Sequence, residues 1–371
     1  MVKFCFVVRF KEEVVLLRSV PCFCFLLTLL TGSAIPVEAV IELEVPEVSD
    51  ATLMPYFLKH FTPGVIKNCA GGDIYYAKSE AAGEAGALVI VDGRTEFMAK
   101  YAEVFYDLRD TGFSFYIYDH RGQGESYRLL PDHQKGHVEH FDDYVEDLHQ
   151  FLETVVKSRP YRTIFLLSHS MGGTISVLHE RKYPGTVTGM ILCSPMFSVN
   201  TIPFPPRAAK ILSRVFNSLG FGSRYVLGGK PYDHNHAFEN NDLTDSFARY
   251  ELNRRRVEEN PRVVLGSPTI SWLAEAFAAM DRIKSDTTPL QIPTLLLVGE
   301  KDTVVGQQAQ KEFCGIQPHC SLSILPHGKH ELLMEKDQVR DAVLRNIKEF
   351  LQRGTVTDSS GSIMGEKREG E

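Results

Sequence analysis

Three residues of this chain, Ser170, Asp302 and His330, have the side-chain types and the order along the sequence that nucleophilic catalysis requires. A serine hydroxyl attacks a carbonyl carbon when a histidine takes its proton and an acid holds the imidazole in the right tautomer. In that scheme His330 accepts the proton of Ser170 and returns it to the leaving group, while Asp302 stabilises the imidazolium. The predicted chemistry is acyl transfer through a covalent intermediate, followed by hydrolysis.

Ser170 lies between an apolar run and a predicted helix, in the sequence Ser-His-Ser-Met-Gly-Gly. Residues 163–167 predict a buried strand, and residues 174–182 predict a helix. A strand, a sharp turn and a helix form a nucleophile elbow, which holds a serine in a strained backbone conformation with its hydroxyl exposed. The elbow needs small residues two positions before and after the serine. Ser168 and Gly172 are small, although the first position is usually glycine.

The candidate acid and base each follow a predicted strand late in the chain. Residues 293–298 predict a strand that leads to Asp302. Residues 321–325 predict a strand that leads, through a polar loop, to His330. Serine, acid and histidine in this order are typical of enzymes that carry a nucleophile elbow.

Both of these assignments have a competitor in the same loop. Glu300 competes with Asp302, but it lies where the predicted strand is just ending. His327 competes with His330, and His330 is favoured because residues 331–334 predict the start of a helix that would fix its position.

The negative charge of a tetrahedral intermediate needs two backbone N–H donors. One comes from the residue after the nucleophile, Met171, and the other from the loop after an earlier strand, which residues 87–91 predict. Arg94 in that loop is the candidate second donor, through its backbone alone. The candidates for contacting substrate are Gly93, which permits a tight turn, His169 and Trp272.

Together these motifs resemble the monoacylglycerol lipase and lysophospholipase group of α/β-hydrolases. The resemblance covers about residues 50–350, and it rests on the loop at 93–96, the stretch 119–126, the elbow and the pair Asp302 and His330. It is strongest to the larger bacterial lysophospholipase that is associated with the inner membrane. The segments that carry it are 92–94, 100–102, 119–124, 136–138, 143–145 and 169–173.

The resemblance implies an α/β fold in which a mostly parallel central sheet is flanked by helices and carries a helical lid as an insertion. It implies hydrolysis of a fatty acyl ester in a one-chain lipid, a lysophospholipid or a monoacylglycerol, without a metal or an organic cofactor. The sequence departs from the pattern at Asp92, where monoacylglycerol lipases carry histidine, and at Ser168. These departures concern the identity of the lipid more than the chemistry.

Composition and charge fit one catalytic domain. With 371 residues, of which 43% are hydrophobic, the chain can bury one large core, and a single domain over residues 50–353 is predicted. The net charge of −7 argues against nucleic acid as a partner, because a phosphate-binding surface shows a basic excess. The polar residues 355–371 predict a disordered tail.

Residues 1–39 form a leader that resembles a secretory signal, because basic residues precede an apolar stretch at 20–30 and small residues follow it. We therefore expect export to the bacterial cell envelope or association with its membrane, with the cytoplasmic face of the inner membrane as the alternative. A bilayer span takes roughly 20 residues, so an uncleaved membrane anchor is less favoured. A spurious extension of the reading frame is the third alternative.

Four of the seven cysteines lie outside this leader. Cys193 ends an apolar run and is predicted to be buried and inert. Cys314 and Cys320 are close enough in sequence to bridge in an oxidising compartment, although spacing does not establish the geometry. The sequence contains no metal-ligand pattern.

About 100 residues separate the strand predicted to end at Cys193 from the one predicted to begin at Pro293, and a lid is predicted there, at about 195–290. Residues 195–232 carry five basic and no acidic side chains. Within them, apolar residues from 211 to 219 recur at helical spacing. Such a helix either docks on an anionic membrane and admits lipid to an acyl pocket, or packs its apolar stripe against the core.

Two further functions remain as alternatives. A serine aminopeptidase would need acidic groups that hold a free amino terminus, and Glu239 and Asp242 in the insertion are available. A hydrolase-like fold that serves only as a binding module is disfavoured, because the catalytic residue types are complete and in the right order.

Overall fold

The structure is a computed structural model, and it describes residues 5–10, 13–18, 49–81 and 85–355. The chain divides into two units, Met1–Leu43 and Glu44–Glu371, and each is described by itself. In the first unit, β1 (Cys5–Phe10) pairs antiparallel with β2 (Glu13–Arg18). The apolar stretch of the predicted signal and the predicted tail from residue 356 lie outside the described residues. No helix in the described part of the chain is long and apolar enough to cross a membrane.

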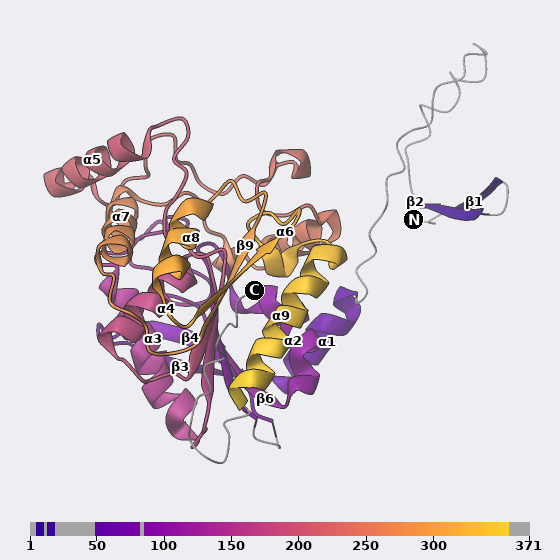
Figure 1. The fold of residues 1–371 in the computed structure, drawn as a ribbon. Coiled ribbons are helices and arrows are strands. Elements are labelled where there is room, and N and C mark those ends of the chain that lie inside the picture. Colours follow the sequence, from indigo (N-terminus) through magenta and orange to yellow (C-terminus); the bar gives the residue numbers. More distant parts are fainter. Residues whose placement is uncertain (1–4, 11–12, 19–48, 82–84, 356–371) are drawn as a thin grey trace, which may run out of the picture. The chain divides into compact units, whose positions relative to one another are not determined.

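An eight-stranded sheet forms the centre of the second unit (Figure 1). Its strands are β3 (Thr62–Lys67), β4 (Asp73–Ser79), β5 (Gly86–Val91), β6 (Phe113–Tyr118), β7 (Ile164–His169), β8 (Gly189–Cys193), β9 (Thr294–Gly299) and β10 (Cys320–Leu325). Their order in the sheet is β10-β9-β8-β7-β5-β6-β4-β3. Only β4 runs antiparallel to its neighbours, so the predicted mostly parallel sheet is confirmed.

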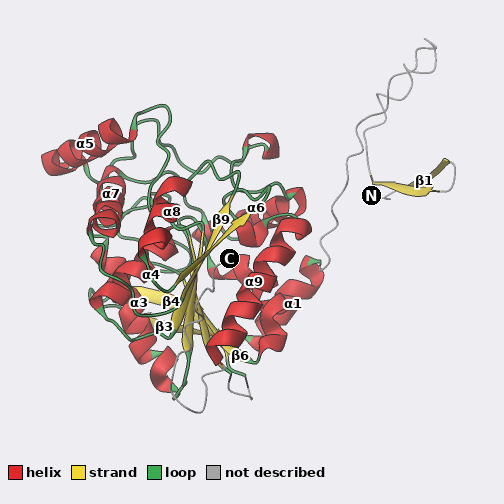
Figure 2. Cartoon of the chain, viewed as in Figure 1, coloured by secondary structure: helices red, strands yellow, loops and turns green. Residues whose placement is uncertain are grey.

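Helices cover both faces of this sheet (Figure 2). They are α1 (Asp50–His60), α2 (Ala102–Leu108), α3 (Asp142–Thr154), α4 (Met171–Lys182), α5 (Pro206–Phe216), α6 (Phe247–Glu259), α7 (Ile270–Ser285), α8 (Gln307–Ile316) and α9 (Asp337–Thr355). Every residue of β5 to β9 is buried, because parallel strands between two helical layers face apolar surroundings on both sides.

The period of two along each strand divides the core into two layers. Val89 of β5 packs in the layer formed with α3, α4, α7 and α8. Its neighbour Leu88 packs in the layer formed with α1, α2 and α9. The predicted flanking of the sheet by helices is therefore confirmed.

The insertion between β8 and β9 carries α5, α6 and α7. Phe277 and Met280 of α7 lie in the same core layer as α4, so α7 is part of the main body. α5 packs against α7 at the margin of the molecule (Figure 1). The part of the insertion that can act as a lid thus ends before α7.

The helix predicted at residues 331–334 is wrong. The segment makes only a single 3₁₀ turn at Leu332–Met334, and α9 begins later, at Asp337. The cause is Glu335, whose carboxylate accepts hydrogen bonds from the backbone N–H groups of Lys329 (2.8 Å) and Asp245 (3.0 Å). These bonds tie the segment to the loop before it and to the insertion, and a continuous helix would break them.

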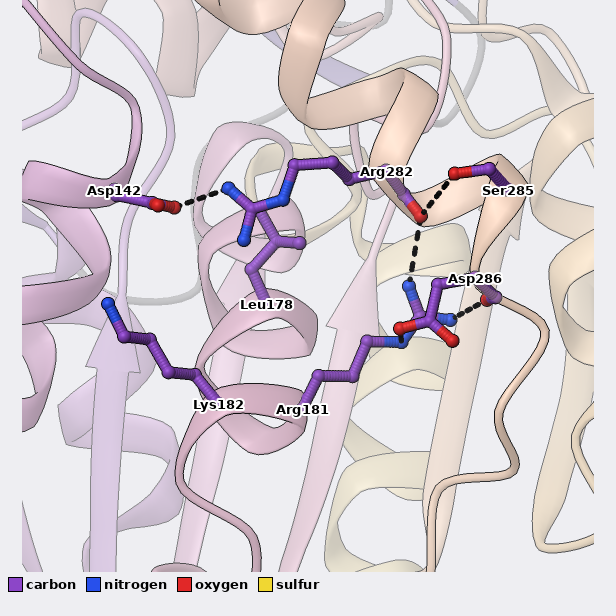
Figure 3. A pocket seen from close by; sticks show the side chains of 7 residues that line it. All are labelled: Asp142, Leu178, Arg181, Lys182, Arg282, Ser285 and Asp286. Carbon is purple, nitrogen blue, oxygen red and sulfur yellow. Dashed lines mark hydrogen bonds and ion pairs between the residues drawn. The ribbon is translucent and has the colours of Figure 1, made fainter.

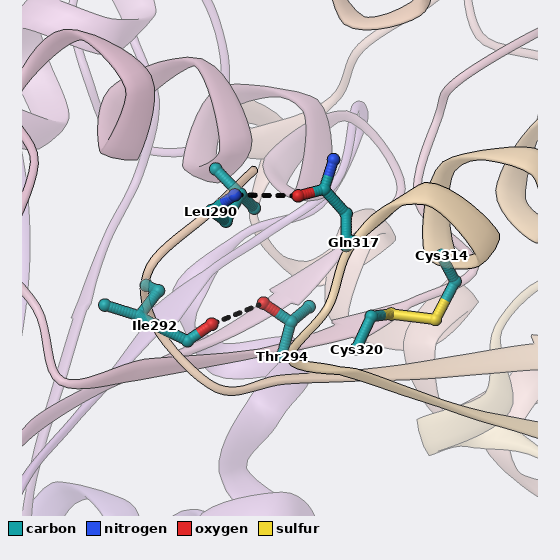
Figure 4. The surroundings of a disulfide bond; sticks show 6 residues. All are labelled: Leu290, Ile292, Thr294, Cys314, Gln317 and Cys320. Carbon is teal, nitrogen blue, oxygen red and sulfur yellow. Dashed lines mark hydrogen bonds between the residues drawn. A yellow bond between two sulfur atoms is a disulfide. The ribbon is translucent and has the colours of Figure 1, made fainter. Parts of the chain in front are cut away.

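Cys314 and Cys320 form a disulfide, with their Cα atoms 5.4 Å apart (Figure 4). The bond joins the end of α8 to the start of β10. In the turn between them, the side chain of Gln317 accepts a hydrogen bond from the backbone N–H of Leu290 (2.7 Å). Cys193 is buried, as predicted, and burial raises the pKa of its thiol to about 12.

Candidate active site

Ser170 lies at the turn between β7 and α4, with φ 49° and ψ −114°. A positive φ is unfavourable for a residue with a side chain, so this backbone is strained in the way that an elbow requires. Gly172 explains why: a Cβ atom there would lie 2.0 Å from the carbonyl oxygen of Val91. The strand and helix backbones are therefore nearly in contact. Ser168 fits in place of the usual glycine because its hydroxyl hydrogen-bonds that of Ser176 (2.7 Å).

Asp302 and His330 meet Ser170 above the carboxyl ends of the parallel strands. The Nε2 atom of His330 lies 3.0 Å from the Oγ atom of Ser170, and its Nδ1 atom lies 2.8 Å from Oδ2 of Asp302. All three side chains are buried. An imidazole that is hydrogen-bonded on both sides in this way can remove the serine proton during attack on a carbonyl carbon.

Asp302 is fixed by its own hydrogen bonds. Its Oδ1 atom accepts from the backbone N–H groups of Val304 (2.9 Å) and Val305 (3.1 Å). Burial raises the pKa of this carboxyl, but the hydrogen bond and charge of His330 and the backbone donors outweigh it, and the pKa lies below its usual value. Asp302 is therefore ionised whenever His330 accepts a proton.

The competing residues lie apart from this arrangement. Glu300 and His327 are exposed, and they bond to each other: the backbone N–H of His327 donates to the Glu300 carboxylate at 3.0 Å. The structure brings Asp302 and His330 to Ser170, and it brings neither Glu300 nor His327 there.

Two backbone N–H groups stand where the negative charge of a tetrahedral intermediate would form. Met171 begins α4, so its N–H has no partner within the helix. Arg94 follows β5 in a loop that Gln123 braces by donating to the Gly93 carbonyl (2.7 Å). Neither N–H donates to an acceptor in the part of the chain that the structure describes. Both are available to an incoming oxyanion.

A buried charge network supports the site from below, and the sequence did not reveal it. Glu96 lies at its centre, 2.9 Å from Nδ1 of His169, 2.8 Å from the Lys100 ammonium and 2.8 Å from the Tyr101 hydroxyl. Lys100 also pairs with Glu331, the residue after His330, at 2.6 Å. The network thereby connects the loop of the oxyanion site to the loop that carries the histidine.

The charges in this network hold each other ionised. Burial raises the pKa of Glu96, but His169 and Lys100 outweigh it and hold that pKa well below its usual value. Burial lowers the pKa of Lys100, but Glu331 and Glu96 raise it above its usual value. The same excess of carboxylates raises the pKa of His169 against the effect of burial.

The three candidates for substrate contact have different positions. Both ring nitrogens of His169 are engaged, by Glu96 and by the His330 carbonyl (3.3 Å), so this side chain braces the histidine loop. Gly93 is buried, and a Cβ atom there would lie 2.8 Å from both Glu96 and His169. Trp272 lines a cavity.

This cavity has a volume of about 780 Å³ and a largely apolar lining. Leu212 and Phe216 of α5 form one wall, and Trp272 of α7 forms another. Val304, two residues after Asp302, and Arg94 also line it. The cavity therefore reaches residues next to both the catalytic acid and the oxyanion site, and its size is typical of a ligand pocket.

A second hollow, of about 390 Å³, is lined by α4 and the end of α7 (Figure 3). Its cations already have carboxylate partners: Arg282 pairs with Asp142, Arg181 with Asp286, and Lys182 with Glu146. It contains none of the three residues of the arrangement around Ser170. Among the described residues, no group of three or more histidine, cysteine or acidic side chains could hold a metal ion.

Comparisons with known proteins agree with this geometry. The family described as serine aminopeptidase, S33 (Hydrolase_4) matches residues 83–337. Lysophospholipase L2 of Escherichia coli is 36% identical over 274 residues, which cover 72% of this chain and 80% of the relative. The human monoglyceride lipase is 25% identical and covers 85% of this chain and 99% of its own length.

Solved structures show the same fold. A soluble variant of the monoglyceride lipase of Saccharomyces cerevisiae, in complex with a substrate analogue, superposes with a TM-score of 0.64 at 18% identity. The match covers 80% of this chain and 96% of the yeast chain. The chain therefore belongs to the Hydrolase_4 family of α/β-hydrolases, and it is a carboxylic ester hydrolase of the lysophospholipase and monoglyceride lipase group.

Proposed function

We propose that this enzyme is a lysophospholipase that releases the fatty acid of a lysophospholipid through an acyl-enzyme on Ser170. The observation that carries the proposal is the hydrogen-bonded series Ser170, His330 and Asp302 beside a large apolar cavity. The choice of a lysophospholipid is supported by the bacterial relative at 36% identity, compared with 25% for the human monoglyceride lipase.

The reaction follows from the contacts of each residue. His330 takes the Ser170 proton as Oγ attacks the ester carbon, and the N–H groups of Met171 and Arg94 stabilise the oxyanion. His330 then gives the proton to the leaving glycerol oxygen. Water enters, His330 removes its proton, and the acyl-enzyme is hydrolysed to fatty acid and free serine.

The cavity suits one acyl chain, because its walls are formed mostly by aliphatic and aromatic side chains. No carboxylate of the described residues lines it. Glu239 and Asp242, which an aminopeptidase could use for a free amino terminus, are both exposed and lie outside its lining. The structure thus favours lipid over peptide, and a monoacylglycerol remains the alternative substrate.

The decisive experiment compares three substrates. Purified enzyme is incubated with lysophosphatidylethanolamine, with a monoacylglycerol of the same chain length and with an aminoacyl amide, and the products are measured by mass spectrometry. We expect the highest kcat/KM for the lysophospholipid and no release by Ser170→Ala protein. Preference for monoacylglycerol would make the enzyme a monoacylglycerol lipase, and preference for the amide would make it a peptidase.

We also propose that the lid docks on a membrane. The apolar stripe of α5 does not pack against the core, as one alternative required: Ile211 is 62% exposed and Leu219, just beyond the helix, is 63% exposed. Ile202, Val215 and Leu227 of the same region are exposed as well. We call these five residues the lid patch. An exposed apolar patch beside a lipid cavity suits contact with a bilayer.

The cations around the lid patch contribute unequally. Lys210 and Arg214 both pair with Asp281, at 2.6 and 2.9 Å, so their charges are largely compensated. Arg207 and Arg224 are exposed and make no ion pair with a carboxylate of the described residues. Apolar burial, with help from these two arginines, is therefore the main expected source of membrane affinity.

Replacing Ile211 and Leu219 together by serine is expected to weaken binding to anionic vesicles by about tenfold or more, because each apolar side chain contributes on the order of 1 kcal/mol on insertion. Vesicle co-sedimentation measures the effect. The matched control is Leu322→Ser with Ile324→Ser on β10, where apolar side chains are similarly exposed outside the lid. Hydrolysis of a short soluble ester is expected to stay the same in all variants. Equal vesicle binding by lid and control variants would refute membrane docking by the lid.

The compartment remains a proposal too. The signal-like leader and the Cys314–Cys320 disulfide support delivery to the oxidising cell envelope. Fractionation of cells that recovered the enzyme in the cytosol, with both thiols reduced, would refute it.

A further inference from the structure

The side chain of Arg94 places a positive charge in the wall of the apolar cavity without a carboxylate partner. Its Nη2 atom donates to the Gly266 carbonyl at 2.5 Å, and the guanidinium lies 5.3 Å from the centre of the Trp272 ring. Its Nε atom is buried without a hydrogen-bond partner. The polar groups that act on its charge are the hydroxyls of Tyr144 and Tyr225, and burial lowers the pKa of Arg94 to about 10.

Other arginines in the interior of this protein are compensated. Arg121 pairs with Asp147 at 2.6 Å, and Arg249 pairs with Glu103 at 2.7 Å. Arg340 pairs with Asp107 at 2.6 Å. Even the arginines of the hollow in Figure 3 have carboxylate partners. Arg94 thus differs from them, and a desolvated cation without a counter-charge is unfavourable unless a ligand supplies the anion.

The position of Arg94 indicates where that anion would lie. Its backbone N–H faces the oxyanion site beside Ser170, and its side chain lines the cavity. In a lysophospholipid, the glycerol backbone places the phosphate only a few bonds from the scissile ester. One arginine can therefore serve both groups, with its backbone at the ester and its guanidinium at the phosphate. Guanidinium groups suit phosphate because they combine charge with several donors.

Arg224 adds a second cation to the same cavity. It contacts the ring of Phe221, at 5.0 Å, and pairs with no carboxylate in the described part of the chain. Two arginines and no carboxylate line this otherwise apolar space. Its charge is complementary to a lipid with one chain and one anionic group.

We propose that the Arg94 guanidinium binds the phosphate of the lysophospholipid and selects it over neutral monoacylglycerol. This inference rests on the proposed function, because it assumes that a lysophospholipid reacts at Ser170. It goes beyond that function by assigning headgroup specificity to one side chain that the chemistry itself does not use.

The test compares Arg94→Met with wild type on lysophosphatidylethanolamine and on a monoacylglycerol of the same chain length. The substitution keeps the backbone N–H and removes the charge. We expect kcat/KM for the lysophospholipid to fall about 10- to 100-fold more than kcat/KM for the monoacylglycerol, and Arg94→Lys to retain most of the preference. If both substrates lose equally, Arg94 serves only to hold Gly266 and Trp272 in place, and the inference is refuted.

A second measurement separates the sources of the anion. Glycerophosphoethanolamine carries the phosphate without the chain, and a free fatty acid carries the carboxylate of the product. Inhibition of soluble-ester hydrolysis by the first, lost in Arg94→Met, supports phosphate binding, whereas loss of inhibition by fatty acid alone identifies a product site and overturns the proposal.

Failure of the variant to fold and failure of the proposed function are both distinguishable. Thermal melting reports folding, and Arg94→Gln provides a second neutral variant. A wild-type enzyme that prefers monoacylglycerol refutes the proposed function directly. A wild-type enzyme that prefers lysophospholipid, with the same preference in Arg94→Met and Arg94→Gln, refutes only the role of Arg94.

Discussion

Replacing Ser170 by alanine is expected to lower kcat for lysophospholipid and monoacylglycerol esters by about 10⁴- to 10⁶-fold. Ser170 Oγ lies 3.0 Å from Nε2 of His330, and no covalent intermediate can form without it. Initial rates of fatty acid release measure the loss. The protein should remain folded, because alanine keeps the small side chain at the strained turn.

The control for this experiment is Ser285→Ala, an exposed serine at the end of α7. It is expected to keep wild-type activity. Detection of an acyl group on wild-type protein by mass spectrometry, at a peptide containing Ser170, would add direct support. Substantial ester hydrolysis by Ser170→Ala would mean that another nucleophile carries the reaction, and the proposed mechanism would be abandoned.

The arrangement around Ser170 could be predicted because its signals are local. The strand, the small residues and the helix around Ser170 are contiguous, and Asp302 and His330 each follow an apolar run that forms a buried strand. Since the carboxyl ends of parallel strands meet at one edge of the sheet, order along the chain becomes proximity in space. The same logic distinguished Asp302 from Glu300, which lies where β9 has just ended.

The network around Glu96 could not be predicted, because its pairs lie far apart in the sequence. His169 is 73 residues and Glu331 is 231 residues from their respective partners Glu96 and Lys100. A buried carboxylate is favourable only when partners surround it, and which partners do so depends on packing that no local pattern encodes. The 3₁₀ turn after His330 has the same origin, since Glu335 bonds to residues of a distant insertion.

The side chain of Arg94 was missed for a related reason. Its backbone role follows from the loop after β5, but the direction of its side chain depends on Trp272 and Gly266, which lie more than 170 residues later. Likewise the stripe of α5 fits both a packed and a docked helix in sequence. Only the exposure of Ile211 and Leu219 distinguishes the two.

Replacing Asp302 by asparagine is expected to lower kcat by about 10⁴-fold while leaving the fold intact. The Oδ1 atom of Asp302 accepts two backbone hydrogen bonds, from Val304 and Val305. Asparagine must keep its carbonyl oxygen there, because both donors need an acceptor, so its NH₂ group faces Nδ1 of His330. The imidazole then carries its proton on Nε2, and it can no longer accept the proton of Ser170.

Steady-state kinetics on a soluble ester measure this effect, and circular dichroism verifies the fold. The matched control is Glu300→Gln, two residues earlier in the same loop. Its carboxylate accepts only from the backbone of His327, outside the site. It is expected to change kcat by less than about threefold, since surface substitutions of this kind have small effects. A large loss in Glu300→Gln with full activity in Asp302→Asn would reassign the orienting acid, because the tautomer argument requires the opposite result.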